Sequence, residues 1–295
     1  MDKIALDKLN AGSEDDFVRA LGDIFEHTPG LARAVYAKRP FASLGALYEA
    51  MEGAARGQSR DEQVRLLQAH PDLAGKAARA GTLTADSKAE QSSAGLDQLS
   101  EDEYTRFHKL NEEYRQKFGI PFIVCVRRHG RDSILREFDR RLGNDAAAEE
   151  KAALTEVLRI AALRLDQRVS ATDRLKVNGR LSTHVLDVHS GRPAQGIAVE
   201  LLTVPRSGPP VVLAKAVTNA DGRTDKPLLA DQPIPIATYE LRFSVGPYFA
   251  TKDVKLADPP FLDTIPLRFS VAEPEGHYHV PLLLTPWGYS TYRGS

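Results

Sequence analysis

Apolar residues in the first half of the chain recur every three or four positions, the spacing of amphipathic helices. Ser13, Ser43 and Ser100 each stand just before such a stretch, where a hydroxyl can accept from the free N–H groups of a helix start. Ser100 is followed three residues later by Glu103, which makes a capping box. The pattern predicts an all-α helical bundle over residues 1–169, with helices beginning near Ser13, Ser43, Arg60, Ser100, Ile134 and Asp145.

The pattern changes over residues 170–180, where turn-forming residues replace the periodicity and a linker is predicted. Beyond it, short β-rich runs are separated by proline and glycine, as in a β-sandwich. We therefore expect a second, all-β domain over residues 181–295. Its predicted strands cover residues 181–188, 198–204, 211–217, 239–245, 250–255 and 264–269, followed by a closing hairpin.

The closing hairpin is predicted over residues 277–295, with its turn at Thr285–Gly288. If Leu284 pairs with Tyr289, counting back places His279 opposite Gly294. Directly opposed residues share a face, and alternate residues of one strand share it too. Two imidazoles and a phenol then crowd one surface, an arrangement that suits a site better than a core. The predicted surface consists of His277, His279, Leu283, Ser290 and Tyr292.

Composition narrows the class of partner. At 295 residues the chain has room for two domains of ordinary size. Its 39 basic and 40 acidic residues give a net charge of −1, which argues against nucleic acid as a partner. The sequence shows one cysteine, Cys125, no signal segment and no apolar run long enough to cross a membrane. We expect a cytoplasmic protein without membrane contact, and the chain does not end in a peroxisomal signal of the Ser-Lys-Leu type.

Four residues of the β half are candidates for chemistry: His184, Arg223, His279 and Tyr292. His184 lies within a predicted strand, Arg223 follows a turn directly, and the other two share the face of the hairpin. An imidazole can activate water, and a guanidinium can stabilise the negative charge that develops on a carbonyl oxygen. The set therefore suits a hydrolase.

Simpler interpretations of the same residues stay open at this point. A histidine in a strand is more often structural than catalytic, and an arginine after a turn is usually solvated. The His277-x-His279 spacing also allows a zinc site, because alternate strand residues can bind one ion. Glu275 has the right alternation for a third ligand, although Gly276 loosens the strand and no fourth ligand is evident.

Several separate motifs of the β half carry a resemblance to a known family. They resemble the 5-hydroxyisourate hydrolase branch of the transthyretin-related family, over roughly residues 178–295. The closing Tyr-Arg-Gly-Ser is the most specific of them, and transthyretins that carry thyroid hormone lack both it and the histidines. The motifs are Leu181–Asp187, Gly191–Ala194, Asp221–Asp225, His277–Leu283 and Tyr292–Ser295.

This resemblance implies a set of roles and an assembly. The catalytic residues would be His184, Arg223 and His279, in a homotetramer whose sites lie in a channel between subunits. No metal is implied. The residues that would complete the site are Tyr292, Arg293, Gly294 and Ser295.

Three polar residues of the α half stand where packing alone does not need them. His70 precedes Pro71, which forces the chain out of a helix. Glu90 lies in a Ser-rich segment, and Arg164 lies beside the apolar stripe of the last helix. Plainer explanations exist, because Ser87 and Glu90 could form a capping box, His70 could end a turn, and Arg164 could reach solvent.

The motifs around these residues resemble a second family, 2-oxo-4-hydroxy-4-carboxy-5-ureidoimidazoline (OHCU) decarboxylase. Members are all-helical and usually dimeric, and the resemblance covers roughly residues 1–169. It rests on Phe41–Leu44, His70–Gly75, Ser87–Gly95, Phe118–Val124 and Ile160–Leu165. The implied catalytic residues are His70, Glu90 and Arg164, and the implied substrate contacts are Pro71, Gln91, Phe122, Ile123 and Val124.

The two resemblances support each other, because the product of the hydrolase is the substrate of the decarboxylase. They imply one bifunctional enzyme of urate degradation, which converts 5-hydroxyisourate to OHCU and then to (S)-allantoin without a cofactor. The implied assembly is a tetramer formed through the β domain, with dimer contacts through the α domain. The alternative is a transthyretin-like ligand-binding or interaction protein that has lost one or both activities.

Overall fold

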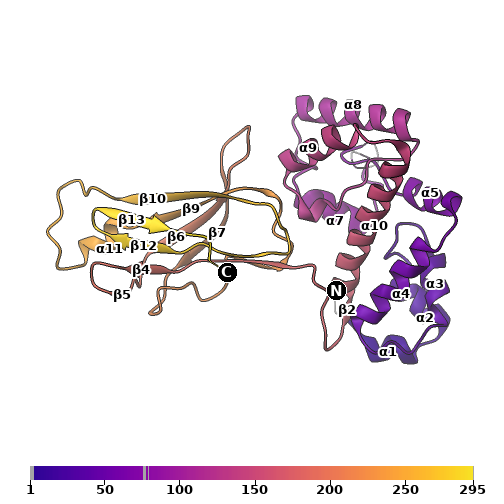
Figure 1. Ribbon diagram of the computed structural model, residues 1–295, viewed down its shortest axis with the longest axis horizontal. Helices are drawn as coiled ribbons and strands as arrows, with labels where there is room; N and C mark the ends of the chain where they lie inside the picture. Colours follow the sequence, from indigo (N-terminus) through magenta and orange to yellow (C-terminus); the bar gives the residue numbers. More distant parts are fainter. Residues whose placement is uncertain (1–2, 76–77, 79, 295) are drawn as a thin grey trace. The chain divides into compact units, whose positions relative to one another are not determined.

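A computed structural model describes residues 3–75, 78 and 80–294, and the chain divides into two compact units (Figure 1). The first comprises Met1–Arg127 and Ser133–Val177, and the second comprises Arg128–Asp132 and Asn178–Ser295. The first unit is mainly helical and the second is built from β-strands.

The predicted helices form, and their ends carry the predicted caps. The hydroxyls of Ser13, Ser43 and Ser100 each accept from the N–H three residues later, and Glu103 completes the capping box. Gly119 ends its helix in the left-handed region, with φ +69, where glycine carries no steric penalty. The described helices of this unit are α1 (Leu6–Ala11), α2 (Glu14–Leu21), α3 (Pro29–Tyr36), α4 (Leu44–Arg56), α5 (Arg60–Gln68), α7 (Ala85–Ser93), α8 (Glu101–Phe118), α9 (Arg131–Arg141) and α10 (Ala146–Arg168).

The prediction of an all-α bundle is too simple for this unit. Strand β1 (Ile4–Ala5) pairs in parallel with β2 (Val169–Ser170), which ties the start of the unit to the end of α10. Two residues per strand are too few for alternation to appear in the sequence. Helices α1 and α3 were also missed. Pro29 begins α3, because proline tolerates the first turn of a helix.

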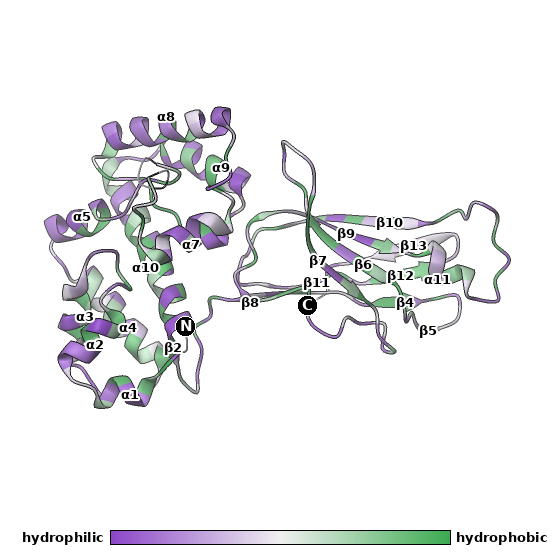
Figure 2. Ribbon diagram, turned by 180° about the vertical axis from the view of Figure 1, so that it is seen from behind, coloured by the Kyte–Doolittle hydropathy of each residue, from purple (hydrophilic) through white to green (hydrophobic). Residues whose placement is uncertain are grey.

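Helix α10 is the central element of the first unit. Thirteen of its 23 residues are buried, including the charged Glu149, Glu156, Arg164 and Asp166. Helix α8 is hydrophilic over most of its length (purple in Figure 2) and buries Phe107, Asn111 and Tyr114. Among the described residues, no helix is both long and apolar enough to cross a lipid bilayer.

The described strands of the second unit form three sheets. One has the order β10 (Thr264–Val271), β9 (Ala237–Ser244), β6 (Ala198–Thr203), β7 (Val211–Val217). The remaining strands are ordered β11 (His277–His279), β3 (Gly179–Ser182), β8 (Leu229–Gln232), and β13 (Gly288–Thr291), β12 (Leu282–Thr285), β4 (Val185–Asp187), β5 (Arg192–Pro193). Because β11 pairs with β3 and β12 with β4, both in parallel, the two segments that carry the candidate histidines run side by side.

One predicted strand does not exist, the single strand predicted over residues 181–188 divides into β3 and β4 of two different sheets, and two strands were missed. Residue 250 ends the short helix α11 (Gly246–Ala250), and residues 251–255 follow it as turns, bends and irregular chain. Pro247 lies in the first turn of that helix, a position that proline tolerates. Tyr248 and Phe249 anchor the helix in the core, and the polar residues that follow it pair with no strand in the described part of the chain. Strands β5 and β8 were missed because they are short and mostly exposed.

The predicted register of the closing hairpin is confirmed. Leu284 pairs with Tyr289 in β12 and β13, and an isolated bridge places His279 opposite Gly294. The even-numbered residues Leu282 and Leu284 are fully buried. The odd-numbered face of this segment, which carries His279, therefore points away from the core.

Candidate active sites

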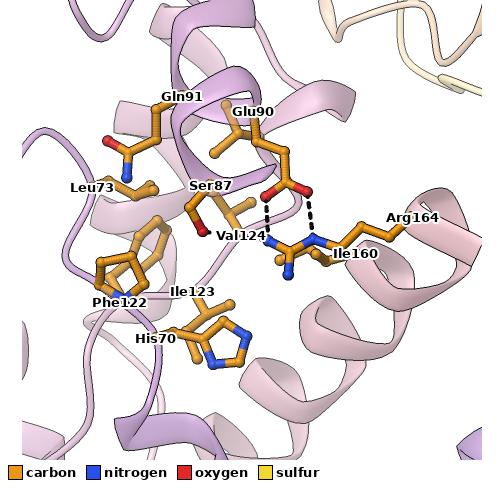
Figure 3. A pocket seen from close by; sticks show the side chains of 12 residues that line it. His70, Leu73, Ser87, Glu90, Gln91, Phe122, Ile123, Val124, Ile160 and Arg164 are labelled. Carbon is orange, nitrogen blue, oxygen red and sulfur yellow. Dashed lines mark hydrogen bonds and ion pairs between the residues drawn. The ribbon is translucent and has the colours of Figure 1, made fainter. Parts of the chain in front are cut away.

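One pocket of the first unit gathers all eight site residues predicted there (Figure 3). It holds about 360 Å³ of empty space, part of it open to solvent. The predicted residues that line it are His70, Pro71, Glu90, Gln91, Phe122, Ile123, Val124 and Arg164, and they are joined by Leu73, Ser87, Val126 and Ile160. They come from elements that are far apart in sequence and combine apolar walls with a few polar groups, as in a ligand-binding pocket.

His70 lies two residues beyond the end of α5 and is buried. Its Nδ1 is 3.0 Å from the carbonyl oxygen of Leu66. A carbonyl only accepts, so Nδ1 carries the proton and Nε2 carries the lone pair. Burial lowers the pKa of His70 to about 4, against the attraction of nearby Glu26. At neutral pH the residue is therefore an uncharged imidazole with a basic Nε2.

Arg164 is buried on α10. This excludes the interpretation in which its side chain extends past the apolar stripe to reach solvent. Its Nε and Nη2 donate to the two carboxylate oxygens of Glu90 at 2.8 and 2.9 Å, in a bidentate pair (Figure 3). Nη2 also lies 3.3 Å from the hydroxyl of Ser87, and Nη1 donates to Glu26 at 2.9 Å.

The capping-box explanation for Glu90 is wrong. The N-cap of α7 is Thr84, whose hydroxyl accepts from the N–H of Ser87. Ser87 and Glu90 therefore lie inside the helix, three positions apart, on the face toward Arg164. Burial raises the pKa of Glu90 above its usual value, although the hydrogen bonds from Arg164 oppose this.

The polar groups of Gln91 and of the 122–124 segment complete the wall of the pocket. The Oε1 of Gln91 accepts from the N–H of Ala74 at 2.9 Å, which identifies the oxygen and leaves the amide NH2 as the donor. Within the described ranges, the N–H groups of Ile123 and Val124 have no hydrogen-bond partner, although both residues are buried. Unpaired buried N–H groups are costly, so their position beside a pocket suits binding of a polar substrate.

A buried cation holds this irregular segment in place. Arg141 donates to the carbonyl of Ile123 at 2.5 Å, lies over the ring of Phe122, and forms a buried ion pair with Glu149. The ring of Phe122 stacks on Phe138 with centroids 3.6 Å apart. The wall is therefore fixed by contacts from behind.

In the second unit, the structure brings His184 and His279 together. His184 lies between β3 and β4, and His279 ends β11. The Nδ1 of His184 is 2.6 Å from the Nε2 of His279, and the rings are nearly parallel. Two N–H groups cannot face each other at this distance, so a single proton lies between the rings. The hydroxyl of Ser182 lies 2.9 Å from the Nδ1 of His279 and orients it.

Arg223 lies beside the histidine pair. An isolated antiparallel β-bridge pairs its backbone with that of His184. Arg223 lines a pocket of about 650 Å³, open to solvent, together with His279 and His277. Burial, followed by the charges of His184 and Arg223, lowers the pKa of His279 to about 4. Burial and the charge of Arg223 also lower the pKa of His184. The site thus keeps neutral imidazoles next to a cation.

The C-terminal residues divide into two groups. The N–H of Gly294 donates to the carbonyl of His279 at 2.8 Å, and a Cβ at Gly294 would come within 2.9 Å of the ring carbon Cδ2 of His279. Tyr292 is 54% exposed, and Arg293 lies over the ring of Tyr278, outside the pocket. The predicted site residue Ser295 lies outside the described residues. A single chain therefore gathers only part of the predicted set.

The geometry does not favour the zinc alternative. Both carboxylate oxygens of Glu275 accept from Arg128, at 2.6 and 2.9 Å, so its charge is already paired. Over the described part of the chain, no three His, Cys, Asp or Glu side chains are grouped in a way that could hold a metal ion.

Sequence reasoning missed three residues that contact the predicted ones. Strand alternation places Ser182 on the same face as His184, two residues before it, but gave it no role, and the structure shows that it contacts His279. Ser87 was considered only as a cap. Glu26 follows α2 in a turn, and no local pattern marks it as a partner of Arg164.

Both halves of the chain match known families. The family described as OHCU decarboxylase matches residues 10–166, and the HIUase/Transthyretin family matches residues 181–294. The 2-oxo-4-hydroxy-4-carboxy-5-ureidoimidazoline decarboxylase of Haloferax volcanii is 41% identical over 58% of this chain and 99% of its own length. The 5-hydroxyisourate hydrolase of Halalkalibacterium halodurans is 50% identical over 40% of this chain and 100% of its own length.

A solved structure spans both units. The crystal structure of an (S)-allantoin synthase is 33% identical, with a TM-score of 0.53, and the match covers 99% of this chain and 100% of that one. The chain belongs to the OHCU decarboxylase family and, through its second unit, to the HIUase/transthyretin family.

Proposed function

We propose that this chain is a bifunctional enzyme of urate degradation. Its second unit hydrolyses 5-hydroxyisourate to OHCU, and its first unit decarboxylates OHCU stereoselectively to (S)-allantoin. The observation that carries the proposal is the match along nearly the whole chain to an (S)-allantoin synthase. Each unit also holds a pocket whose groups suit one of the two reactions.

In the hydrolase site, the paired imidazoles act as the base. Water attacks a ring carbonyl of the substrate, and its proton passes to the His184–His279 pair. The ring C–N bond then breaks as the pair returns that proton to the leaving nitrogen. Arg223 stabilises the negative charge that develops on the carbonyl oxygen. Ser182 holds the ring of His279 in orientation. The low pKa of His279 keeps the pair neutral and ready to accept a proton at physiological pH.

In the decarboxylase site, the substrate supplies its own electron sink. Loss of carbon dioxide leaves an electron pair that the imidazoline ring of OHCU accepts, so the protein needs to orient the carboxylate and deliver one proton to one face. Arg164 holds Glu90 in place through its bidentate contact, while His70 and Glu90 position the hydroxyl and supply the proton. The N–H groups of Ile123 and Val124 donate to the polar groups of the imidazoline ring.

We also infer that the hydrolase site is completed by a neighbouring copy, in a tetramer formed through the second unit. Tyr292 and Arg293, which the family resemblance assigns to the site, lie outside the pocket of a single chain. Strand β13 is the edge of its sheet, and an edge strand offers unpaired backbone groups to another chain. The mass of the full chain in solution, measured by light scattering, tests this inference.

The proposed function is tested by adding freshly generated 5-hydroxyisourate to the full chain and following its absorbance. We expect its decay to be faster than the spontaneous rate, and OHCU to be consumed in turn. Binding that protects 5-hydroxyisourate without turnover would instead support a transthyretin-like ligand-binding protein.

Replacement of Gly294 by alanine is expected to slow hydrolysis roughly 10- to 100-fold, because misplacement of a catalytic group by about 1 Å has effects of this size. The new Cβ would meet the ring of His279 at 2.9 Å and displace it from His184. Initial rates of 5-hydroxyisourate decay measure the effect. Gly288→Ala is the matched control in the same hairpin, since its nearest neighbour would be the Thr285 hydroxyl at 3.7 Å. Equal rates for both variants would contradict the role of Gly294.

The hydrolase is expected to stay active well below the ordinary histidine pKa of about 6.5. Because the pKa of His279 is lowered to about 4, the base remains neutral until the pH approaches that value. The expected kcat/KM is flat from pH 7.5 to about 5 and falls below this. Half-maximal activity near pH 6.5 would show that the base is an unperturbed histidine.

A further inference from the structure

One buried carboxylate near the decarboxylase pocket has no role in the proposed reaction. Glu26 lies in the turn after α2, is 2% exposed, and does not line the pocket. A buried carboxylate is costly unless it is paired and hydrogen-bonded. Its two contacts therefore indicate what it does.

Glu26 joins the two elements that carry the reacting groups. Its Oε2 accepts from Nη1 of Arg164 on α10 at 2.9 Å. Its Oε1 accepts from the hydroxyl of Thr84 at 2.7 Å, and Thr84 is the N-cap of α7, the helix of Glu90. The carboxylate thus lies behind Arg164, on the side that Glu90 leaves unoccupied.

Two carboxylates share one guanidinium in this cluster, and their surroundings differ. The pKa of Glu26 lies below its usual value, because Thr84 and Arg164 outweigh the effect of burial. The pKa of Glu90 lies above its usual value, because of burial and of repulsion by Asp86 and Glu26. Neighbouring titratable groups whose pKa values are moved in opposite directions are typical of a proton-transfer site.

We propose that Glu26 is a positioning residue of the decarboxylase: it balances the charge of Arg164, so that Glu90 can take up and release a proton. This inference rests on the proposed function of the pocket. Without Glu26, Arg164 would hold its full charge against Glu90 and fix that carboxyl in its ionised form. With Glu26 present, Arg164 stays in place whether or not Glu90 carries a proton.

The other charged groups around the cluster do not replace Glu26. Asp86 is 4.0 Å from Nε of Arg164, and its carboxylate accepts from Nη2 of Arg168 at 2.7 Å. The carboxylate of Asp23 also pairs with Arg168, and only its backbone carbonyl reaches Arg164. His70, from the end of α5, is neutral at physiological pH. The groups that face Glu90 are therefore Arg164, Glu26, Asp86 and His70, with Arg168 behind them.

The test is the titration of Glu90 in the full chain, read from its carboxyl infrared band. The band is identified as the one lost in Glu90→Gln. In Glu26→Gln, which keeps the shape and removes the charge, we expect the pKa of Glu90 to fall by about one to two pH units. The limb of the pH–rate profile that Glu90 controls should move down equally. An unchanged or higher pKa overturns the proposal.

Two further variants separate charge from packing. Glu26→Asp keeps the charge, so the pKa of Glu90 should stay close to that of the unaltered chain; a fall equal to that in Glu26→Gln overturns the proposal. Asp166→Asn removes another buried carboxylate of α10, which pairs with Arg174. It should leave the Glu90 titration unchanged, and an equal shift there would overturn the assignment to Glu26.

If Glu26→Gln does not fold, the titration of the unaltered chain tests the role of Glu26. As the pH falls, Glu90 must take up its proton before Glu26 does, and the reverse order overturns the proposal. The infrared titration needs no turnover. A shift of Glu90 in a chain that does not decarboxylate OHCU would therefore support the positioning role while refuting the proposed function.

Discussion

His279→Ala is expected to lower the rate of 5-hydroxyisourate hydrolysis by roughly 10²- to 10⁴-fold, the usual contribution of a positioned base. The substitution removes the partner that shares a proton with His184 at 2.6 Å, and it also frees the Ser182 hydroxyl. His184 would then be a single imidazole without a fixed orientation. Initial rates of substrate decay, followed by absorbance, measure the loss.

The same chain supplies the controls for this variant. Decarboxylation of added OHCU should be unchanged, since His70, Glu90 and Arg164 belong to the first unit. His277→Ala should lower the rate tenfold or less, because the hydrogen-bond contact of its Nε2 among the described residues is with Ser182, at 3.4 Å. Hydrolysis at the full rate in His279→Ala would remove the histidine pair from the mechanism.

His70→Ala is expected to abolish the optical purity of the product. Without the imidazole, OHCU would lose carbon dioxide only by its slow spontaneous reaction, and protons would arrive on both faces. The product should then be racemic, and the enzymatic rate should fall by roughly 10²- to 10⁴-fold. Circular dichroism of the accumulating allantoin measures both effects.

His108→Ala is the matched control for this second prediction. His108 belongs to the same unit but lies on α8, away from the pocket, with Glu112 at 3.6 Å. Its replacement should leave both rate and chirality unchanged. Formation of optically pure (S)-allantoin by His70→Ala at the normal rate would exclude His70 from the reaction.

The first unit also responds to pH through His70. In the unfolded chain this histidine takes up a proton near its ordinary pKa of about 6.5, whereas in the folded chain its pKa is about 4. The unfolded state therefore binds more protons between these values, and the free energy of unfolding decreases as the pH falls through that range. This loss of stability at low pH is the consequence of keeping His70 neutral in the folded chain.

The sequence predicted those features that local chemistry determines. Caps at Ser13, Ser43 and Ser100 need only a hydroxyl and the N–H three residues on, so they could be identified without a fold. The hairpin register followed from one pair, Leu284 with Tyr289, because strand alternation leaves no freedom once a turn is placed.

Features that depend on distant partners could not be derived in this way. The pairing of β1 with β2 joins residues far apart in sequence, and each strand has only two residues. Glu26 lies 138 positions before Arg164, and nothing in its own neighbourhood indicates that contact. The apparent strand at residues 250–255 failed because the pattern alone cannot show whether a sheet edge lies nearby.

The candidate sites also combine features that local patterns predict with features that depend on distant partners. Helix periodicity placed Arg164 toward the interior, which is where it lies, but did not reveal its two carboxylate partners. Family resemblance supplied the set of residues, and the fold brings eight of them into one pocket. Tyr292 and Arg293 remain predictions, because a single chain leaves them outside the hydrolase pocket.

We expect one chain to convert 5-hydroxyisourate to (S)-allantoin through both of its units. The most direct measurement follows circular dichroism after freshly generated 5-hydroxyisourate is mixed with the full chain. We predict a rapid loss of the substrate signal, then growth of the signal of (S)-allantoin alone, faster than the spontaneous reaction. Decay at the spontaneous rate, or a product without optical activity, would contradict the proposed bifunctional activity.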